Sequence, residues 1–325
     1  MDWEKQRNSG FFDTDTHIPR RTVIKPISAF LLLVLTVSAA FADGFVIPEG
    51  QNPYAAATFE CLGLYWKTDA DSTMTCAVSW RKSGGGDWKQ ALPLWYDARD
   101  REFRGSIVGL SPDIAYEIRL ECNGSTASLK ARTRSDRFPV GKTTFLPDST
   151  LGGTIRVTEA GTSGAWHLVT PADGAKTVLD PENFSDYNII VESSYVIIRG
   201  LELKNARIHS ILIRAGVHDV VVEDCRFAFW GRGGGPRSFG NEGGSDSAVF
   251  AEKGTAGIII QHNLMENPRG ASNDWDTGHP NGPQGITLID SKGGNVIRYN
   301  EIRSTEDHGF NDGFGGGSNY SFEGS

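Results

Sequence analysis

Three glycine-rich stretches in the second half of this 325-residue chain carry most of the side chains that could do chemistry. They are residues 230–246, 268–279 and 306–312. Carboxylates and imidazoles move protons near neutral pH, and guanidinium groups bind anions in a fixed geometry. Acids and histidines in such loops also bond their own backbone in turns, so we assign a site to the three stretches together rather than to any one residue. The candidates are Trp230, Arg232, Arg237, Glu242, Asp246, Arg269, Asp274, Asp276, His279, Glu306, Asp307, His308 and Asp312.

The elements that must position these stretches repeat along the chain. Four segments, 198–203, 222–227, 260–265 and 297–302, share an apolar residue, two mostly polar ones, a turn position, one further residue and an apolar one. A second strand-like segment precedes the later three, at 211–214, 248–252 and 286–290. Repeats of this length predict a stack of units, because one unit cannot bury its own apolar face. The turn positions are Leu201, Cys225, Asn263 and Asn300, separated by 24, 38 and 37 residues.

Each glycine-rich stretch follows a repeat at the same position, after Phe227, Met265 and Ile302. Loops inserted at one position of a stack project from one side, which is often the binding face. The bordering segments end in Glu252, Asp290 and Glu323, which we expect one rung apart. Like charges at about 5 Å require a protonated carboxyl or a bridging cation such as Ca²⁺. In the alternative, Glu252 and Asp290 pair weakly with the adjacent Lys253 and Lys292.

The order of strand, turn, strand, asparagine turn and long loop resembles a right-handed parallel β-helix of the pectate-lyase-like superfamily, over residues 142–325. The resemblance implies an all-β fold and an asparagine ladder at Asn263 and Asn300, which Leu201 and Cys225 interrupt. Lyases, hydrolases, esterases and inert adhesins share this scaffold, so it does not decide the chemistry. The chain ends within a strand and without a capping segment, so we expect it to be part of a longer protein.

For function, the resemblance implies a polysaccharide as partner, and we expect an acidic glycan. A lyase would bind Ca²⁺ through Glu252, Asp290 and Glu323 and remove a proton with a base such as Arg232, Arg269, Lys253, Lys292 or His279. A hydrolase would use two acids, for example Asp307 and Asp312. The stretches match no catalytic signature of the superfamily, so lyase, hydrolase and a non-catalytic glycan-binding or adhesin-like solenoid all stay open. The predicted catalytic residues are Asp307, His308, Asp312, His279 and Arg269, and the predicted substrate-binding residues are Arg232, Arg237, Trp230, Asp274, Asp276, Lys253 and Lys292.

The first half of the chain predicts a small β-sandwich. Residues 54–134 contain short alternating strands broken by polar turns, and 110–116 has the Leu-x-Pro-x-x-x-Tyr pattern of a tyrosine corner. This part resembles a fibronectin type III module, which we place at 43–135, with a linker at 136–141. In that resemblance Cys61 and Cys122 face each other across the core, which implies a disulfide between them.

The N-terminus and the overall charge indicate export and exclude nucleic acid as a partner. A basic patch at 20–25 precedes an apolar run at 27–42 that ends in Ala-Phe-Ala, as in a secretory signal, so we expect cleavage after Ala42 and a protein that is secreted, periplasmic or on the cell surface. After cleavage no membrane segment is expected. A net charge of −8 and a pI of about 5.4 are unlike a nucleic-acid binder. The sequence gives no indication of oligomeric state.

Overall fold

The computed structural model describes residues 50–70, 73–232, 246–269 and 283–303. In this part of the chain the regular elements are all β-strands, and no helix long and apolar enough to cross a membrane is found. The expected signal segment lies outside the described residues. So do ten candidate site residues: Arg237, Glu242, Asp274, Asp276, His279, Glu306, Asp307, His308, Asp312 and Glu323.

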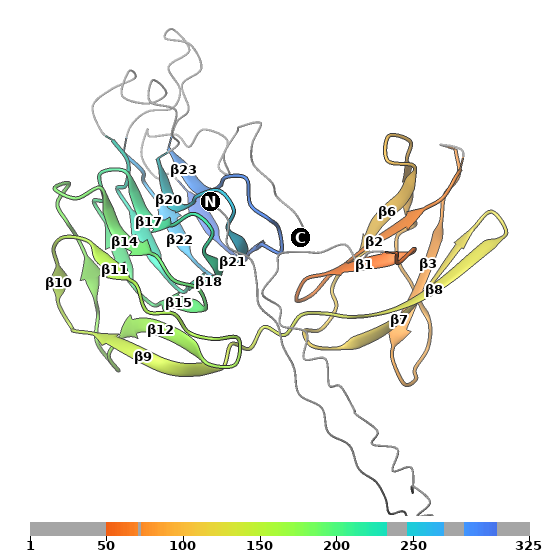
Figure 1. The fold of residues 1–325 in the computed structure, drawn as a ribbon, viewed down its shortest axis with the longest axis horizontal. Helices are drawn as coiled ribbons and strands as arrows, with labels where there is room; N and C mark the ends of the chain where they lie inside the picture. The colour runs from red at the N-terminus through yellow and green to blue at the C-terminus, as the bar shows by residue number, and fades with distance from the viewer. Residues whose placement is uncertain (1–49, 71–72, 233–245, 270–282, 304–325) are drawn as a thin grey trace, which may run out of the picture. The chain divides into compact units, whose positions relative to one another are not determined.

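The N-terminal part is built from two four-stranded antiparallel sheets (Figure 1). One contains β1 (Tyr54–Ala57), β2 (Leu62–Lys67), β6 (Glu102–Ile107) and β5 (Trp95–Asp97) in that order. The other contains β4 (Lys89–Gln90), β3 (Ala77–Lys82), β7 (Ala115–Cys122) and β8 (Ser125–Arg132). The predicted tyrosine corner is present, because the backbone N–H of Ser111 donates to the Tyr116 hydroxyl at 2.9 Å. The arrangement is compatible with the expected sandwich.

The structure corrects the expected disulfide. Cys61 and Cys122 are free buried thiols. Successive side chains of a strand point to opposite faces, and the sandwich core contains Leu62 and Leu64 but not Cys61. The Cys61 side chain therefore points to the other face of its strand, next to Ser106, and does not face Cys122 across the core.

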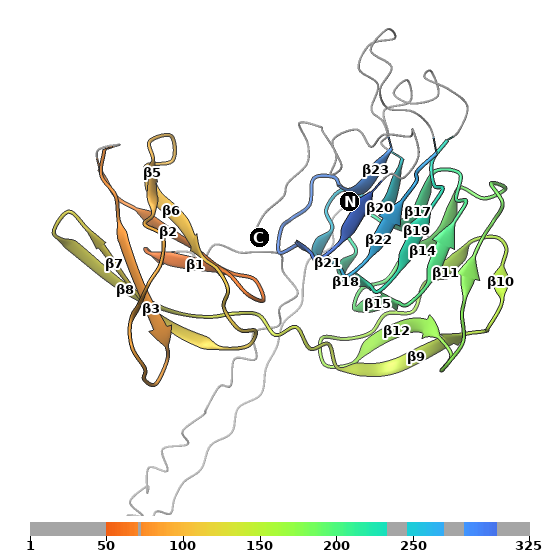
Figure 2. The ribbon, with the colours of Figure 1, turned by 180° about the vertical axis from the view of Figure 1, so that it is seen from behind.

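From Val140 onward the chain forms a stack of parallel strands in three sheets (Figures 1 and 2). Sheet 1 contains β9 (Val140–Leu146), β12 (Trp166–Pro171), β15 (Val196–Arg199), β18 (His218–Glu223), β21 (Ala256–Gln261) and β24 (Val296–Arg298). Sheet 2 contains β10 (Thr150–Leu151), β13 (Val178–Leu179), β16 (Glu202–Lys204), β19 (Arg226–Ala228), β22 (Leu264–Glu266) and β25 (Glu301–Arg303). Sheet 3 contains β11 (Ile155–Val157), β14 (Tyr187–Val191), β17 (His209–Ile213), β20 (Ser247–Ala251) and β23 (Gln284–Leu288). Each of the first five rungs gives one strand to each sheet, and the described part of the sixth gives β24 and β25, which confirms the β-helix-like solenoid.

The solenoid core consists of columns of apolar side chains that face inward from all three sheets. Equivalent residues of successive rungs are paired in register, so each column repeats one position of the rung. Examples of these fully buried columns are Ile198–Val222–Ile260, Leu203–Phe227–Met265 and Ile211–Val249–Ile286. Burying one such side chain contributes about 1.5–3 kcal/mol to the free energy of unfolding.

The turn residues Leu201, Cys225, Asn263 and Asn300 lie in single file, as the repeats predict, because the strands that follow them are paired in register. The predicted asparagine ladder spans the last two of them. Asn263 accepts the backbone N–H of Cys225 at 3.0 Å and donates to the carbonyl of Val222 at 2.9 Å. Asn300 in turn accepts the backbone N–H of Asn263 at 3.1 Å and its side-chain amide at 2.9 Å. The corners of these rungs are thereby cross-linked.

The ladder predicts that the two asparagines act as a unit. We expect Asn263→Ala to lower the free energy of unfolding by about 2–3 kcal/mol, because the buried N–H of Cys225 loses its acceptor. Asn300→Ala should cost less on its own, and the double variant should cost less than the sum of the two. Urea unfolding of the four proteins measures this coupling, and strictly additive losses would contradict a continuous ladder.

Candidate functional site

A column of left-handed residues stands just before the turn file on the outside of the solenoid. Gly200, Asp224, His262 and Tyr299 have φ values of 72°, 54°, 56° and 55°. This backbone conformation costs glycine nothing and is tolerated by aspartate and histidine, but it is uncommon for a bulky residue. Asp224, His262 and Tyr299 are nevertheless exposed. Since backbone strain gathers at functional sites, this corner is a candidate site that the sequence analysis did not single out.

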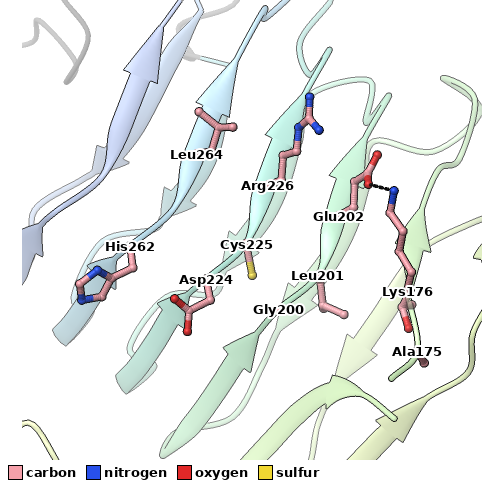
Figure 3. A pocket seen from close by; sticks show the side chains of 11 residues that line it. Ala175, Lys176, Gly200, Leu201, Glu202, Asp224, Cys225, Arg226, His262 and Leu264 are labelled. Carbon is pink, nitrogen blue, oxygen red and sulfur yellow. Dashed lines mark ion pairs between the residues drawn. The ribbon is translucent and has the colours of Figure 1, made fainter. Parts of the chain in front are cut away.

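An open groove of about 470 Å³ lies over this corner (Figure 3). It crosses four successive rungs, which are spaced by about 4.8 Å in a parallel stack. Each rung contributes at least one charged or imidazole side chain, and turn residues contribute to the lining. The lining residues are Ala175, Lys176, Thr177, Gly200, Leu201, Glu202, Asp224, Cys225, Arg226, His262 and Leu264.

The groove carries both signs of charge. The Lys176 ammonium lies 3.0 Å from the carboxylate of Glu202, and the side chain of Lys176 is 75% exposed. A dashed line marks this ion pair in Figure 3. The Arg226 guanidinium donates through Nε to Glu266 at 2.8 Å. Glu266 also accepts from Arg303 of the next rung at 3.0 Å. Burial acts to raise the pKa of Glu266, but the hydrogen bonds from the two arginines outweigh it and hold that pKa below its usual range. Glu266 therefore stays ionised, and its carboxylate holds Arg226 in place beside the groove.

An aromatic pair adjoins the groove. The rings of His262 and Tyr299 are stacked, with centroids 5.2 Å apart and an interplanar angle of 21°. Tyr299 is 61% exposed, and its hydroxyl donates to Glu60. Flat exposed rings offer an apolar surface together with a polar edge. Such a surface suits a ligand that has both C–H faces and hydroxyls.

Of the described side chains from the first loop, Trp230 is not at a surface. It is fully buried in the solenoid core, and its indole N–H donates to the carbonyl of Gln284 at 3.0 Å. Arg232 forms an ion pair at 2.9 Å with Asp246, the residue at the other end of the same loop. Asp246 is itself fully buried and also accepts the backbone N–H of Arg232 at 2.8 Å. The expected substrate contact of Trp230 is thus corrected to a core position, and Arg232 closes the base of its loop.

Arg269 begins the second loop and ties rungs together. Its guanidinium donates to the carbonyls of Phe229 at 2.7 Å and of Ala206 at 2.8 Å. Burial lowers the pKa of Arg269, with Asp180 and Asp246 acting in the opposite direction. These contacts give Arg269 a positioning role between rungs, and its catalytic role stays a prediction.

The carboxylates expected to bind Ca²⁺ are out of register. Ala251 pairs with Leu288, so Glu252 stands opposite Ile289, and Asp290 stands opposite Lys253. Glu252 is already bound to Arg214 at 2.7 Å and to the backbone N–H of Ala215 at 2.8 Å. A shift of one residue turns a side chain to the other face, so the expected column of Glu252 and Asp290 does not form. Within the described ranges no three His, Cys, Asp or Glu side chains gather to hold a metal ion. Lys253 and Lys292 are exposed nearby.

Beside the first loop, sheet 3 contains a buried histidine. The His209 ring stacks on Phe250 with centroids 4.3 Å apart and on Tyr187 at 5.9 Å. Its Nδ1 accepts the backbone N–H of Ser247 at 3.0 Å. Burial, with a smaller contribution from Arg232, lowers the pKa of His209 to about 3. The ring is therefore a neutral structural element.

Comparison with known proteins gives weak likenesses. No family model and no curated protein matches the chain. Among solved structures, pectate lyase PelI from Erwinia chrysanthemi in complex with tetragalacturonic acid is 12% identical, covers 78% of this chain and 84% of its own, and has a TM-score of 0.23. A second structure of PelI from Erwinia chrysanthemi is also 12% identical, covers 76% of this chain and 85% of its own, and has a TM-score of 0.19. The sensor domain of the anti-sigma factor RsgI4 from Pseudobacteroides cellulosolvens is 14% identical, covers 26% and 90%, and has a TM-score of 0.20. The fold described above therefore rests on this chain's own strand pairing.

The Arg232–Asp246 contact predicts a structural defect when it is broken. We expect Arg232→Ala to lower the free energy of unfolding by about 3–5 kcal/mol, because it leaves a buried carboxylate without its partner. The matched control is Arg156→Ala, which removes an exposed arginine paired with Glu192 and should cost less than about 1 kcal/mol. Urea unfolding measures both losses. A stable Arg232→Ala protein with weakened ligand binding would instead make Arg232 a substrate contact.

His209 predicts a pH-dependent stability between about pH 3 and 6.5. The unfolded histidine binds a proton near pH 6.5, whereas folded His209 stays neutral down to about pH 3. Its contribution is thus complete above pH 6.5 and is lost as the pH falls. Between pH 7 and pH 5, we expect the free energy of unfolding of the wild type to fall by about 2 kcal/mol more than that of His209→Gln. Urea unfolding at the two pH values tests this, and equal losses would contradict it.

Proposed function

We propose that this chain is an exported polysaccharide-active β-helix protein that binds an acidic glycan in the groove over the turn file. The observation that carries the proposal is that four successive rungs each place a polar or ionic side chain in one open groove. A glycan chain is a linear repeat of sugar rings, so a linear repeat of binding groups suits it. The stacked His262 and Tyr299 supply a platform at one end.

The charges of the groove favour an acidic polymer. The chain as a whole is acidic, so an anionic ligand needs local cations. Arg226 and Lys176 are 56% and 75% exposed, and each lies beside a carboxylate. A uronate carboxylate would replace Glu266 as the ionic partner of Arg226, or Glu202 as that of Lys176. Asp224 would accept hydrogen bonds from sugar hydroxyls. Calcium is not required for this mode of binding.

Turnover is assigned to the loops that follow β19, β22 and β25. The groove lies at the start of these strands and the loops leave from their ends, and three residues of strand span about 10 Å. A glycan in the groove would therefore extend along the outer face of sheet 2 toward the ends of these strands. We place the proton-transferring groups among Asp307, His308, Asp312 and His279, with Arg269 as a positioning residue.

A non-catalytic glycan-binding protein is the second candidate, and a specific observation favours it. Among the described residues, three of the groups expected to do chemistry are engaged in structure: Arg232 with Asp246, Arg269 with two carbonyls, and Glu252 with Arg214. The groove, in contrast, is open.

Binding by the groove is tested with two variants and two matched controls. We expect Arg226→Ala to raise the Kd for oligogalacturonate about tenfold, because it removes a charge-assisted hydrogen bond. Tyr299→Ala should weaken binding to a similar extent. The controls are Arg156→Ala, whose side chain is 57% exposed against 56% for Arg226, and Phe184→Ala, an exposed ring outside the groove. Titration calorimetry with the full chain measures all four, and unchanged binding in the first two would place the ligand elsewhere.

Turnover is tested on a panel of uronate polymers, with Ca²⁺ added or chelated. Growth of absorbance from unsaturated sugar ends would identify a lyase, and new reducing ends without that absorbance a hydrolase. Binding without either product would support the second candidate. If the protein is an enzyme, at least one substitution among Asp307, His308, Asp312, His279 and Arg269 should abolish turnover. Full rates in all five would move the reaction away from these loops.

A further inference from the structure

Two cysteines of the sandwich face each other across neighbouring strands. β3 and β7 run antiparallel, with Ala77 paired to Glu121, so the next pair outward is Cys76 and Cys122. Cys76 exchanges its backbone hydrogen bonds with Leu94 on its other side, at 3.3 and 2.8 Å. Cys76 and Cys122 are therefore a non-hydrogen-bonded pair, in which the Cα atoms are about 4.5 Å apart and the side chains are closest. That separation lies within the range of about 4.4–6.8 Å that a disulfide spans.

The two thiols are neighbours. Both are buried in the sandwich core, Cys76 completely and Cys122 to 6% exposure, and Cys122 is among the groups that act on the pKa of Cys76. Burial, followed by the neighbouring Cys122, raises the pKa of Cys76 to about 12, so the folded pair is a pair of protonated thiols.

The other two cysteines have different neighbours. Cys61 lies outside the sandwich core, next to Ser106. Cys225 lies in the solenoid core, where its thiol contacts the carbonyls of Ile198 and Glu223. Among the four cysteines, the geometry therefore selects one pair.

We propose that Cys76 and Cys122 form a cross-strand disulfide in the exported protein, and that Cys61 and Cys225 stay reduced. Oxidation requires a disulfide donor, such as an oxidised dithiol protein or glutathione disulfide. One cysteine thiolate attacks the donor's S–S bond and releases one donor thiol. The second cysteine then displaces the other donor thiol from the mixed disulfide. Two protons leave the cysteines and the donor gains two electrons.

The timing and the effect follow from the burial of the pair. A thiolate is the attacking species, and the folded thiols are protonated and shielded. The exchange therefore takes place while the chain is folding, before the sheet closes over the pair. The finished bond encloses residues 76–122 and restricts the unfolded chain, which stabilises the sandwich.

The experiment refolds the full chain from the reduced, denatured state with glutathione disulfide as the oxidant. We expect two titratable thiols in denaturant instead of four, and an intact mass lower by about 2 Da. Trypsin digestion without reductant should join peptide 68–81 to peptide 120–130. Four free thiols, or a join between the Cys61 and Cys122 peptides, would overturn the proposal.

Serine variants of the four cysteines test which two of them form the disulfide. Cys61→Ser and Cys225→Ser should each leave one titratable thiol and keep the joined peptides. Cys76→Ser should leave three thiols and lose the join. The wild type should unfold at a lower temperature when it is reduced, whereas a Cys76→Ser/Cys122→Ser double variant should show no change with reductant. If a serine variant does not fold, the peptide map of the wild type decides alone.

Discussion

The pairing of each rung with the next, in register, is the constraint on which the solenoid depends. Parallel strands satisfy one another's backbone groups only if equivalent residues lie side by side, and here they do so in all three sheets. Because of this pairing, equivalent residues of a weak sequence repeat form columns of side chains along the stack. Inside, the columns are apolar and fill the core. At the corner between sheets 1 and 2, where a turn leaves polar backbone buried, Asn263 and Asn300 supply the missing partners.

The groove is a product of the same corner. The chain changes direction there in every rung, and in four successive rungs it does so through an outward left-handed residue: Gly200, Asp224, His262 and Tyr299. Stacking then brings Asp224, His262 and Tyr299 into one line, although 38 and 37 residues separate them in sequence. Binding groups on a stacked scaffold are thus held by the core beneath them. Arg226 illustrates this, because Glu266 and Arg303 of later rungs fix its position.

The sequence predicted the stack, the turn file and the ladder, because apolar periodicity and asparagine at fixed positions are local signals. It also predicted the corner formed by Tyr116, whose pattern is contiguous. It failed where the outcome depends on small shifts. Glu252 and Asp290 differ by one residue in register, so they do not lie side by side. Cys61 is one residue before Leu62, whose side chain enters the core, so the Cys61 side chain points to the opposite face of the strand. Trp230 looked like a loop residue because glycines follow it, yet it fills the core. The sequence did not reveal the groove because its left-handed residues sit one position before the repeat's turn, where the residue type varies from Gly to Tyr.

That variation at the outward corner has a consequence for how such a protein changes. The residues there have left-handed backbone and contribute no side chain to the core, while the neighbouring inward positions are fixed by packing. Glycine, asparagine, aspartate and histidine all tolerate this conformation, whereas β-branched residues do not. Substitutions among these few residue types can therefore change the outward corner of each rung while the core beneath it stays intact. Duplicating or deleting a rung would lengthen or shorten the groove in steps of about 4.8 Å.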